Sequence, residues 1–161
     1  MANVVITRRD SVLDQLELVR HRIAQRAYEL FRHRDGGSED PVADWLAAER
    51  EILWTPAIEV SEKDETFTIL AALAGVEPKD VSVEVSAQDL VIKGETAHTH
   101  PKSQGWVHRC EFTTGQLFRA VRFPKPVDPA KAKTVYRNGL LTVTVSIASK
   151  AQAKRDGTKA A

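Results

Sequence analysis

Residues 134–147 read TVYRNGLLTVTVSI, and this stretch decides the fold. Asn138-Gly139 is the strongest two-residue signal for a β-hairpin, because both residues readily adopt the positive φ angles of a tight turn. The apolar residues that follow occupy every second position: Leu141, Val143 and Val145. This alternation is typical of a strand with one buried face. The sequence therefore predicts a hairpin here whose apolar face turns toward a core.

The same period of two recurs throughout residues 56–147. The alternating apolar positions are Phe67, Ile69 and Ala71; Val81, Val83 and Val85; Leu90 and Ile92; and Leu117, Val121 and Phe123. Turn-forming residues such as Gly75, Gly94 and Pro124 separate these runs. At least six strands without long intervening helices predict a mainly β chain. We expect residues 56–147 to form an immunoglobulin-like antiparallel β-sandwich.

Residues 1–55 form a separate segment with a helical period. They contain eight Arg, no Lys and ten acidic residues, which indicates either a distinct module or a bias in gene composition. Apolar residues recur every three or four positions and predict an amphipathic helix from about Asp10 to Arg34: Val12, Leu16, Val19, Ile23, Ala27 and Leu30. After Gly36-Gly37, Asp40 as an N-cap and Pro41 begin a second helix, which is expected to end near Leu53.

The composition of the whole chain excludes several classes of protein. With 161 residues and a net charge of +1, the chain has no electrostatic bias toward nucleic acid or an anionic membrane. It has neither an apolar run long enough to span a bilayer nor a signal-peptide pattern, so a cytoplasmic location is expected. The single cysteine, Cys110, excludes an internal disulfide. Residues 148–161 are polar and are predicted to be a disordered tail.

Four motifs, in order along the chain, resemble the small heat-shock proteins, which are built on an alpha-crystallin domain. They are AALAGV (71–76) with DVSVEV (80–85), LVIKGE (90–95), GQLFR (115–119) with FP (123–124), and YRNGLLTV (136–143). The resemblance implies an ATP-independent holdase chaperone, which binds unfolding client proteins and forms homodimers and higher oligomers. The alternative is a non-enzymatic dimeric interaction or assembly module without general affinity for clients.

The N-terminal segment has a resemblance of its own. RAYELF (26–31) and DWLAAERE (44–51) are similar to a short bacterial two-helix domain of unknown function. Two helices of this length bury too little surface to be stable alone, so their apolar faces are expected to pack on a neighbour or a partner. We predict that five of these side chains supply client or inter-dimer contacts: Leu30, Phe31, Trp45, Leu46 and Leu53.

The resemblance also places a dimer interface. In the bacterial and plant branch of the family, the loop that matches residues 95–108 carries a strand that pairs with the sheet of a second subunit. This assigns Trp106, Val107 and Arg109 to the interface, with a mobile surface loop as the alternative. Arg119 matches an interfacial arginine of the family. An arginine among apolar neighbours needs a charged partner, for which Glu111 and Asp80 are available, unless it is an ordinary surface residue.

Higher assembly in this family uses a C-terminal Ile-x-Ile or Ile-x-Val anchor, which docks in a groove of a neighbouring dimer. The resemblance assigns the groove to a β-edge that includes Val81, Val83, Val85 and Val135. The tail after Ile147 has no such anchor. The apolar residues Val4 and Ile6 are a substitute, because an alternating apolar segment can add to a sheet edge.

Chemistry at a small-molecule or metal site is not expected. The residues lack a phosphate-binding loop, a nucleophile elbow and a second cysteine, so we predict no catalytic residues, no cofactor and no enzyme activity. Four residues form the one metal-like constellation: His98, His100, His108 and Cys110. Their spacing would allow nitrogen and sulfur ligands to converge if the loop folded back, but a loop context argues against a metal.

Overall fold

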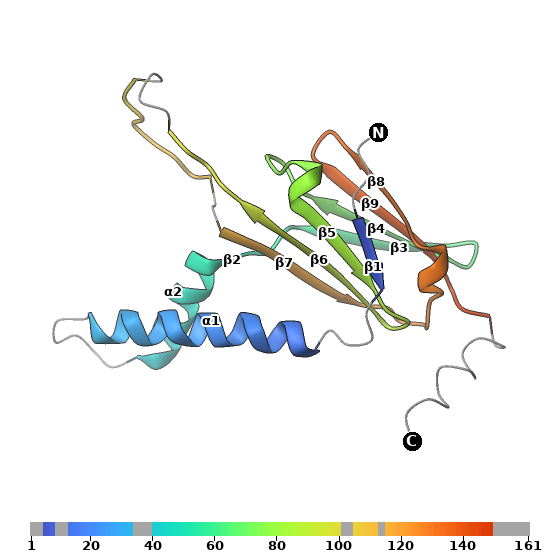
Figure 1. The fold of residues 1–161 in the computed structure, drawn as a ribbon, viewed down its shortest axis with the longest axis horizontal. Coiled ribbons are helices and arrows are strands. Elements are labelled where there is room, and N and C mark those ends of the chain that lie inside the picture. The colour runs from blue at the N-terminus through green and yellow to red at the C-terminus, as the bar shows by residue number, and fades with distance from the viewer. Residues whose placement is uncertain (1–4, 9–12, 34–39, 101–104, 113–114, 150–161) are drawn as a thin grey trace.

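The structure is a computed structural model that describes residues 5–8, 13–33, 40–100, 105–112 and 115–149. Two β-sheets stack face to face, and two helices lie against the outer face of one sheet (Figure 1). The predicted mainly β sandwich with a two-helix N-terminal segment is confirmed. The tail predicted from residue 148 lies almost entirely outside the described residues.

The first sheet has five strands in the order β1-β5-β6-β7-β2. Their bounds are β1 Val5–Arg8, β2 Leu53–Trp54, β5 Val81–Val85, β6 Asp89–Thr96 and β7 Gly115–Arg122. The central strands pair antiparallel, whereas β1 runs parallel to β5 and β2 runs parallel to β7. The sequence did not predict these parallel pairs. They arise because both outer strands come from the N-terminal segment, and no hairpin connects either strand to its partner.

The second sheet has four antiparallel strands in the order β3-β4-β9-β8. Their bounds are β3 Ile58–Lys63, β4 Thr66–Ala72, β8 Lys133–Arg137 and β9 Leu140–Ser146. The short 3-10 helices η1 (Pro78–Asp80) and η3 (Pro129–Lys131) precede β5 and β8. The predicted hairpin between β8 and β9 is confirmed, with φ angles of 53° at Asn138 and 74° at Gly139.

The core lies between the sheets and is built from the alternating apolar residues of both. The largest side chains that are almost completely buried in it include Phe67, Ile69, Leu73, Leu90, Ile92, Leu117 and Leu141. Burial of a side chain of this size contributes roughly 1.5–3 kcal/mol relative to exposure. At the rim of the core, the Tyr136 hydroxyl lies 2.8 Å from the Leu73 carbonyl oxygen and 2.6 Å from that of Val76. Burial raises the pKa of the Tyr136 phenol.

Helix α1 spans Leu13–Arg32 and helix α2 spans Pro41–Ile52. The Asp40 carboxylate accepts hydrogen bonds from the backbone N–H groups of Val42 and Ala43, both at 3.1 Å, which confirms the predicted N-cap. Leu53 is already extended and begins β2, so α2 ends one residue earlier than predicted. Among the described residues, neither helix combines the length and the apolar character needed to cross a bilayer.

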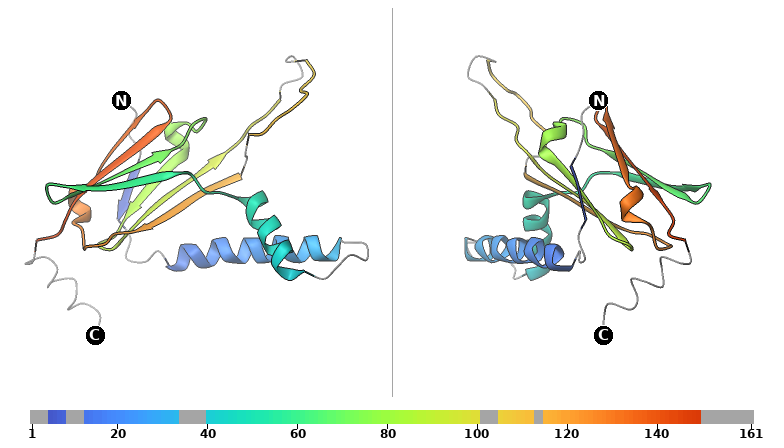
Figure 2. Two further views of the ribbon diagram at one scale, coloured as in Figure 1. Left: turned by 180° about the vertical axis from the view of Figure 1, so that it is seen from behind. Right: turned by 45° about the vertical axis from the view of Figure 1, so that its right-hand side comes forward.

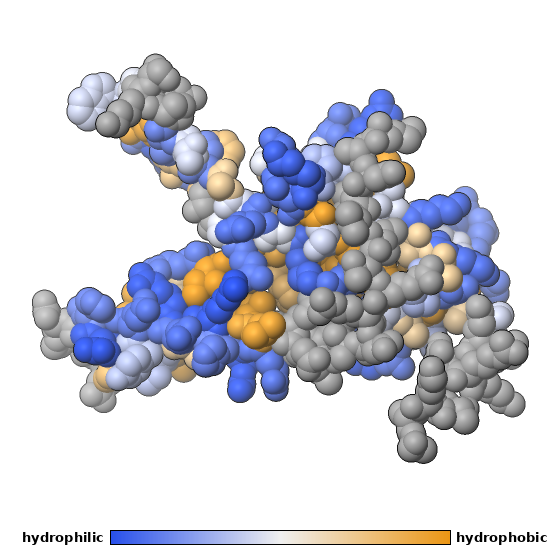
Figure 3. Space-filling view, in the orientation of Figure 1, coloured by the Kyte–Doolittle hydropathy of each residue, from blue (hydrophilic) through white to orange (hydrophobic). Residues whose placement is uncertain are grey.

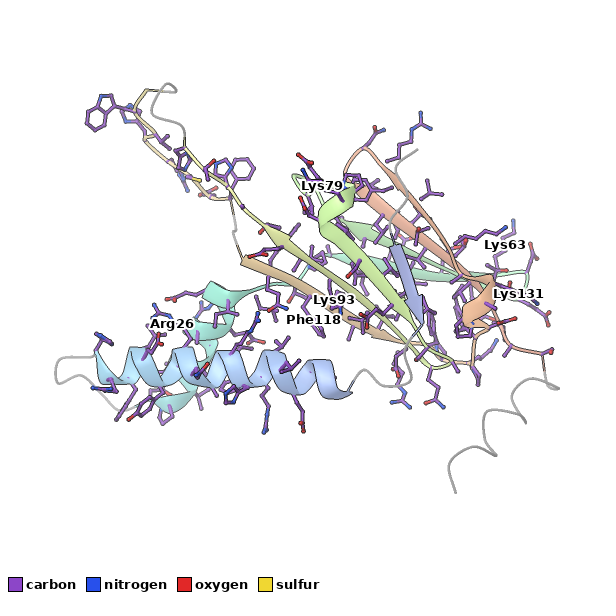
Figure 4. All side chains as sticks on the ribbon, in the orientation of Figure 1. Arg26, Lys63, Lys79, Lys93, Phe118 and Lys131 are labelled. Carbon is purple, nitrogen blue, oxygen red and sulfur yellow. The ribbon has the colours of Figure 1, made fainter. Side chains whose placement is uncertain are left out.

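The helices pack on the side of the first sheet that faces away from the second sheet (Figure 2). Their contact has five buried members: Val19 and Ile23 from α1, Ala48 from α2, Val91 from β6 and Phe118 from β7. Figure 4 shows Phe118 on the side of the sheet that faces α1. Two polar contacts join the same elements. Arg22 donates to the Gln116 side chain at 2.8 Å, and Arg26 pairs with Glu51 at 2.7 Å.

Candidate interaction surfaces

The segment between β6 and β7 projects from the sandwich as an arm (Figures 1 and 2). We define the arm as residues 97–112, of which 97–100 and 105–112 are described. Trp106 is 94% exposed, and Val107 and Phe112 are also exposed. Arg109 pairs with Glu111, and both side chains lie in solvent. The predicted interface residues Trp106, Val107 and Arg109 therefore share one exposed segment.

The strand β3 forms an edge of the second sheet. It pairs with β4 and with no other described strand, so one line of its backbone N–H and C=O groups lacks a strand partner in this part of the chain. Five of its six residues are exposed, including Val60. An edge of this kind is a template for an added strand.

The edge of β5 differs from the prediction in two respects. Val81, Val83 and Val85 point into the core and are at most 3% exposed, so their side chains do not line a groove. The reason is their spacing, because residues two apart on one strand face the same side. Val135 on β8 is exposed. The backbone of the β5 edge is already paired, with β1 of the same chain, over Val5–Arg8.

Of the two predicted anchor residues, the structure describes one. Ile6 lies in β1 and aligns with Val83 of β5, whereas Val4 lies outside the described residues. The predicted addition of this segment to a sheet edge is thus present within one chain, where the expectation was a neighbouring dimer. The parallel register runs from Val5 with Ser82 to Arg8 with Val85.

Arg119 lies on β7 opposite Ile92 of β6, on the same side of the strand as Leu117 and Val121. Its side chain is half-buried, and its Nε is buried without a hydrogen-bond partner among the described residues. Neither predicted partner reaches it. Glu111 is engaged by Arg109 on the arm, and no contact joins Arg119 to Asp80 in the described chain. Neither acid pairs with Arg119 within the described chain, so a charged partner for Arg119 at a dimer interface stays a prediction.

Large apolar side chains are also exposed on the helices, and Figure 3 shows hydrophobic residues at the surface beside α1. We use the term helical surface for six exposed large apolar side chains that are spread around the two helices: Leu16, Leu18, Tyr28 and Phe31 on α1, and Val42 and Leu46 on α2. Leu16 and Leu18 are two residues apart and therefore face different sides of α1. The rings of Tyr28 and Phe31 stack with centroids 6.4 Å apart. A hollow between the helices is lined in part by Leu18, Ala24 and Trp45.

The five predicted contact residues of the N-terminal segment divide into two groups. Phe31 and Leu46 are about half exposed, at 48% and 46%. Leu30, Trp45 and Leu53 are partly buried against the cluster that joins the helices to the sheet. The period of the helix placed all five on apolar faces, but it did not show which of these faces the sheet would cover.

A comparison with known protein families matches residues 59–158 to the Hsp20/alpha crystallin family. The matched region is more than half of the chain and contains the arm and all of β3 except its first residue, Ile58. The chain belongs to the Hsp20/alpha crystallin family. The resemblance inferred from the four ordered motifs is therefore confirmed, and the protein is a small heat-shock protein by family.

Relatives in this family come from distant organisms. The chain is 33% identical over 97 residues to a probable 15 kDa heat shock protein of Leptospira interrogans, covering 60% of this chain and 73% of that protein. It is 36% identical over 105 residues to the 16.9 kDa class I heat shock protein 1 of Oryza sativa, covering 64% and 67%. Among solved structures, Heat shock protein 16.0 from Schizosaccharomyces pombe superimposes with a TM-score of 0.55 at 30% identity, covering 60% of this chain and 90% of that one.

The helical segment has a separate match. Residues 20–53 match a family described as a protein of unknown function (DUF2934), which confirms the predicted second resemblance and assigns no activity. In this small heat-shock protein, α2 and most of α1 thus come from a different family than the sandwich.

Sequence reasoning missed the two sheet residues that pack against the helices, Val91 and Phe118. A signal was present. In the runs Leu90-Val91-Ile92 and Leu117-Phe118, an apolar residue occupies the position that an exposed strand face would give to a polar one. Apolar residues on both faces of β6 and β7 indicate a sheet that is covered on both sides.

The arm also brings together most of the metal-like constellation. Donor atoms of His98, His100 and Cys110 all lie within 4.8 Å of one another, while His108 is not part of this group. All three side chains are exposed. The His98 ring stacks on Phe112 with centroids 4.3 Å apart.

Proposed function

We propose that this small heat-shock protein is an ATP-independent holdase, which binds unfolding proteins and prevents their aggregation. One observation carries the proposal: the distribution of large apolar side chains that remain exposed. Of the twelve in the described chain, six form the helical surface and three, Trp106, Val107 and Phe112, lie on the arm. Only Val60, Val135 and Leu140 belong to the sandwich.

This distribution supports a binding role, because the exposed apolar side chains are concentrated on the helices and the arm, where apolar groups of a partner can cover them. Unfolding proteins expose apolar segments of their own, and they aggregate through those segments. A surface that covers such a segment competes with aggregation and needs no nucleotide to do so. We assign client binding first to Phe31 and Leu46, the two predicted contact residues that are about half exposed.

We further propose that the protein is a homodimer formed through the arm. The arm of one copy would add to the open β3 edge of another and bury Trp106, with Val107 and Arg109 beside it. The support is the near-complete exposure of Trp106, at 94%, and the edge of β3, which has no other described strand partner. A second copy would also supply a charged or carbonyl partner for Arg119, whose Nε lacks one among the described residues of its own chain.

The proposed organisation assigns residues 56–147 to the dimerisation scaffold and residues 1–55 to the client-binding segment, with residues 148–161 as a solubilising tail. We place the protein in the cytoplasm because its one cysteine, Cys110, fits a reducing compartment. The net charge of +1 supports partners that are proteins over nucleic acid or an anionic membrane. No enzyme activity is assigned.

The test measures how well the full chain suppresses heat-induced aggregation of an unrelated protein, by light scattering, with and without ATP. A holdase suppresses aggregation at near-stoichiometric ratios under both conditions. Leu46→Ser should raise the amount of protein needed several-fold. Leu140→Ser is the matched control, because Leu140 is similarly exposed, at 41% against 46%, but lies on the sandwich.

Two results would contradict the proposal. If the native chain suppresses aggregation neither with ATP nor without it, the protein is an assembly module without general affinity for clients. If Leu140→Ser weakens suppression as much as Leu46→Ser, client binding does not reside on the helices. Native mass by light scattering separately tests the dimer, and Trp106→Ala should shift the mass toward the monomer.

A further inference from the structure

We propose that His98, His100 and Cys110 of the arm form a binding site for one zinc ion. Donor atoms of the three side chains all lie within 4.8 Å of one another. Tetrahedral zinc holds nitrogen and sulfur at about 2.0–2.3 Å, which places the ligand atoms roughly 3.3–3.8 Å apart. The side chains are exposed, so rotations that move the donor atoms by about 1 Å suffice to close the difference.

The chemistry of the donor set favours a borderline-soft cation. Two imidazole nitrogens and one thiolate sulfur match zinc, whereas calcium and magnesium prefer oxygen. Three protein ligands leave a fourth position for water, an arrangement known in zinc sites of proteins. Binding would release the proton of the Cys110 thiol to solvent, because the thiolate is the ligand.

Contacts around the cluster help to position it. The His98 and His100 rings meet edge to face with centroids 4.7 Å apart. The Phe112 ring stacks on the His98 ring with centroids 4.3 Å apart. The nearby cation Arg109 is paired with Glu111, which offsets its repulsion of an incoming metal ion. These five residues and Cys110 line one hollow on the arm.

The site would connect the two sides of the arm. His98 and His100 precede the tip of the arm, and Cys110 follows it, so one ion bound by all three closes a short loop that contains Trp106 and Val107. Closure of a loop removes conformational freedom from the residues within it. Because Trp106 and Val107 belong to the proposed dimer interface, zinc binding would then affect dimer formation. This effect on the dimer rests on the proposed function, whereas zinc binding by one chain is independent of it.

The experiment titrates the reduced, full-length protein with Zn2+ in a non-chelating buffer by isothermal calorimetry. One ion per chain is expected. Cys110→Ser and His98→Ala should each weaken binding about tenfold or more. His108→Ala is the matched control on the arm, and His21→Ala is the control on α1, because neither side chain belongs to the cluster. Both controls should bind zinc as the native chain does.

Cobalt provides a second readout. Co2+ bound by the native chain should give a thiolate-to-metal charge-transfer absorption, and Cys110→Ser should remove it. The variants are expected to keep the native fold, verified by circular dichroism, since none of the three residues lies in either hydrophobic cluster.

The proposal is overturned by any of three results: no saturable zinc binding, an affinity unchanged in both Cys110→Ser and His98→Ala, or a loss in His108→Ala as large as in His98→Ala. One ion per two chains would also overturn it, by assigning the metal to a contact between copies. Suppression of client aggregation, measured without zinc, stays an independent test of the proposed function.

Discussion

The two faces of the first sheet support hydrophobic clusters of very different extent. The inner face contributes to a core that includes residues from strands of both sheets and is closed at its rim by Tyr136. The outer face contacts the helices through five buried residues, with Val91 and Phe118 as the members from the sheet. Besides this apolar contact, the exposed Arg22 side chain of α1 donates a hydrogen bond to the Gln116 side chain of β7.

This difference indicates separate stabilities within one chain. Local opening requires less free energy where fewer apolar contacts are broken. We therefore expect the helices to detach from the sheet while the sandwich stays folded. Detachment would expose Val91 and Phe118 and so enlarge the apolar surface beside the helices.

The largest effect is expected in the core of the sandwich. Ile69 on β4 is fully buried, so Ile69→Ala should lower the free energy of unfolding by about 2–5 kcal/mol, through lost burial and a residual cavity. Urea denaturation followed by circular dichroism measures the change. Val60→Ala, at an exposed position of the adjacent β3, is the control and should change stability by about 0.5 kcal/mol or less. Equal losses in both variants would show that β4 does not contribute a close-packed core.

A smaller and more local effect is expected in the contact between helix and sheet. Ile23→Ala should destabilise the helical layer by about 2 kcal/mol, at the low end for such a truncation because the cluster is small. Hydrogen exchange should accelerate roughly 30-fold in α1 and α2. Amides of β4 and β9 should keep their rates, and Leu18→Ala on the exposed side of α1 is the control. Equal acceleration in β4 and β9 would mean that helices and sandwich open as one unit.

The smallest effect concerns the Tyr136 hydroxyl. Tyr136→Phe should cost about 1 kcal/mol near neutral pH, because one hydrogen bond to a backbone carbonyl is lost. Burial raises the pKa of this phenol, so its protonated form is favoured by folding. The resulting stability is present below the ordinary tyrosine pKa of about 10 and is lost as pH rises through the raised value.

Denaturation curves at several alkaline pH values test this sign. The native chain should lose stability more steeply above about pH 10 than Tyr136→Phe does. Tyr28→Phe is the control, since Tyr28 is exposed on α1. If the native chain and Tyr136→Phe show parallel pH profiles, the Tyr136 phenol is not protected by the fold.

The strength of local signals explains which parts of the fold were predictable. Asn138-Gly139 predicted the hairpin of β8 and β9, because these two residue types favour positive φ angles. The hairpin of β3 and β4 was missed. Its turn is Asp64-Glu65, with φ angles of 48° and 56° and no glycine, and β3 is too exposed to show a strong apolar alternation.

The interaction surfaces were less predictable, because burial depends on contacts distant in sequence. Trp106 is exposed on the arm, and its place in a dimer interface stays a prediction from the family resemblance. The valines of β5, which were predicted to line a groove, belong to the core between the sheets. Trp45 and Leu53, which were predicted to contact clients, are partly buried against the cluster that joins the helices to the sheet. A periodic pattern identifies an apolar face, but the element that covers it comes from elsewhere in the chain. For Arg119, the local sequence offered two acids, and neither pairs with it within the described chain.

The pairings of β1 and β2 have a mechanical consequence for the helices. These strands flank the helical segment in sequence and occupy the two opposite margins of one sheet, so the helices are tethered at both ends. The β2 tether pairs only two residues with β7, and the β1 tether pairs four with β5. If one tether opens, the other keeps the helices at a high effective concentration beside the sheet. Reclosure is then unimolecular, and its rate is independent of dilution.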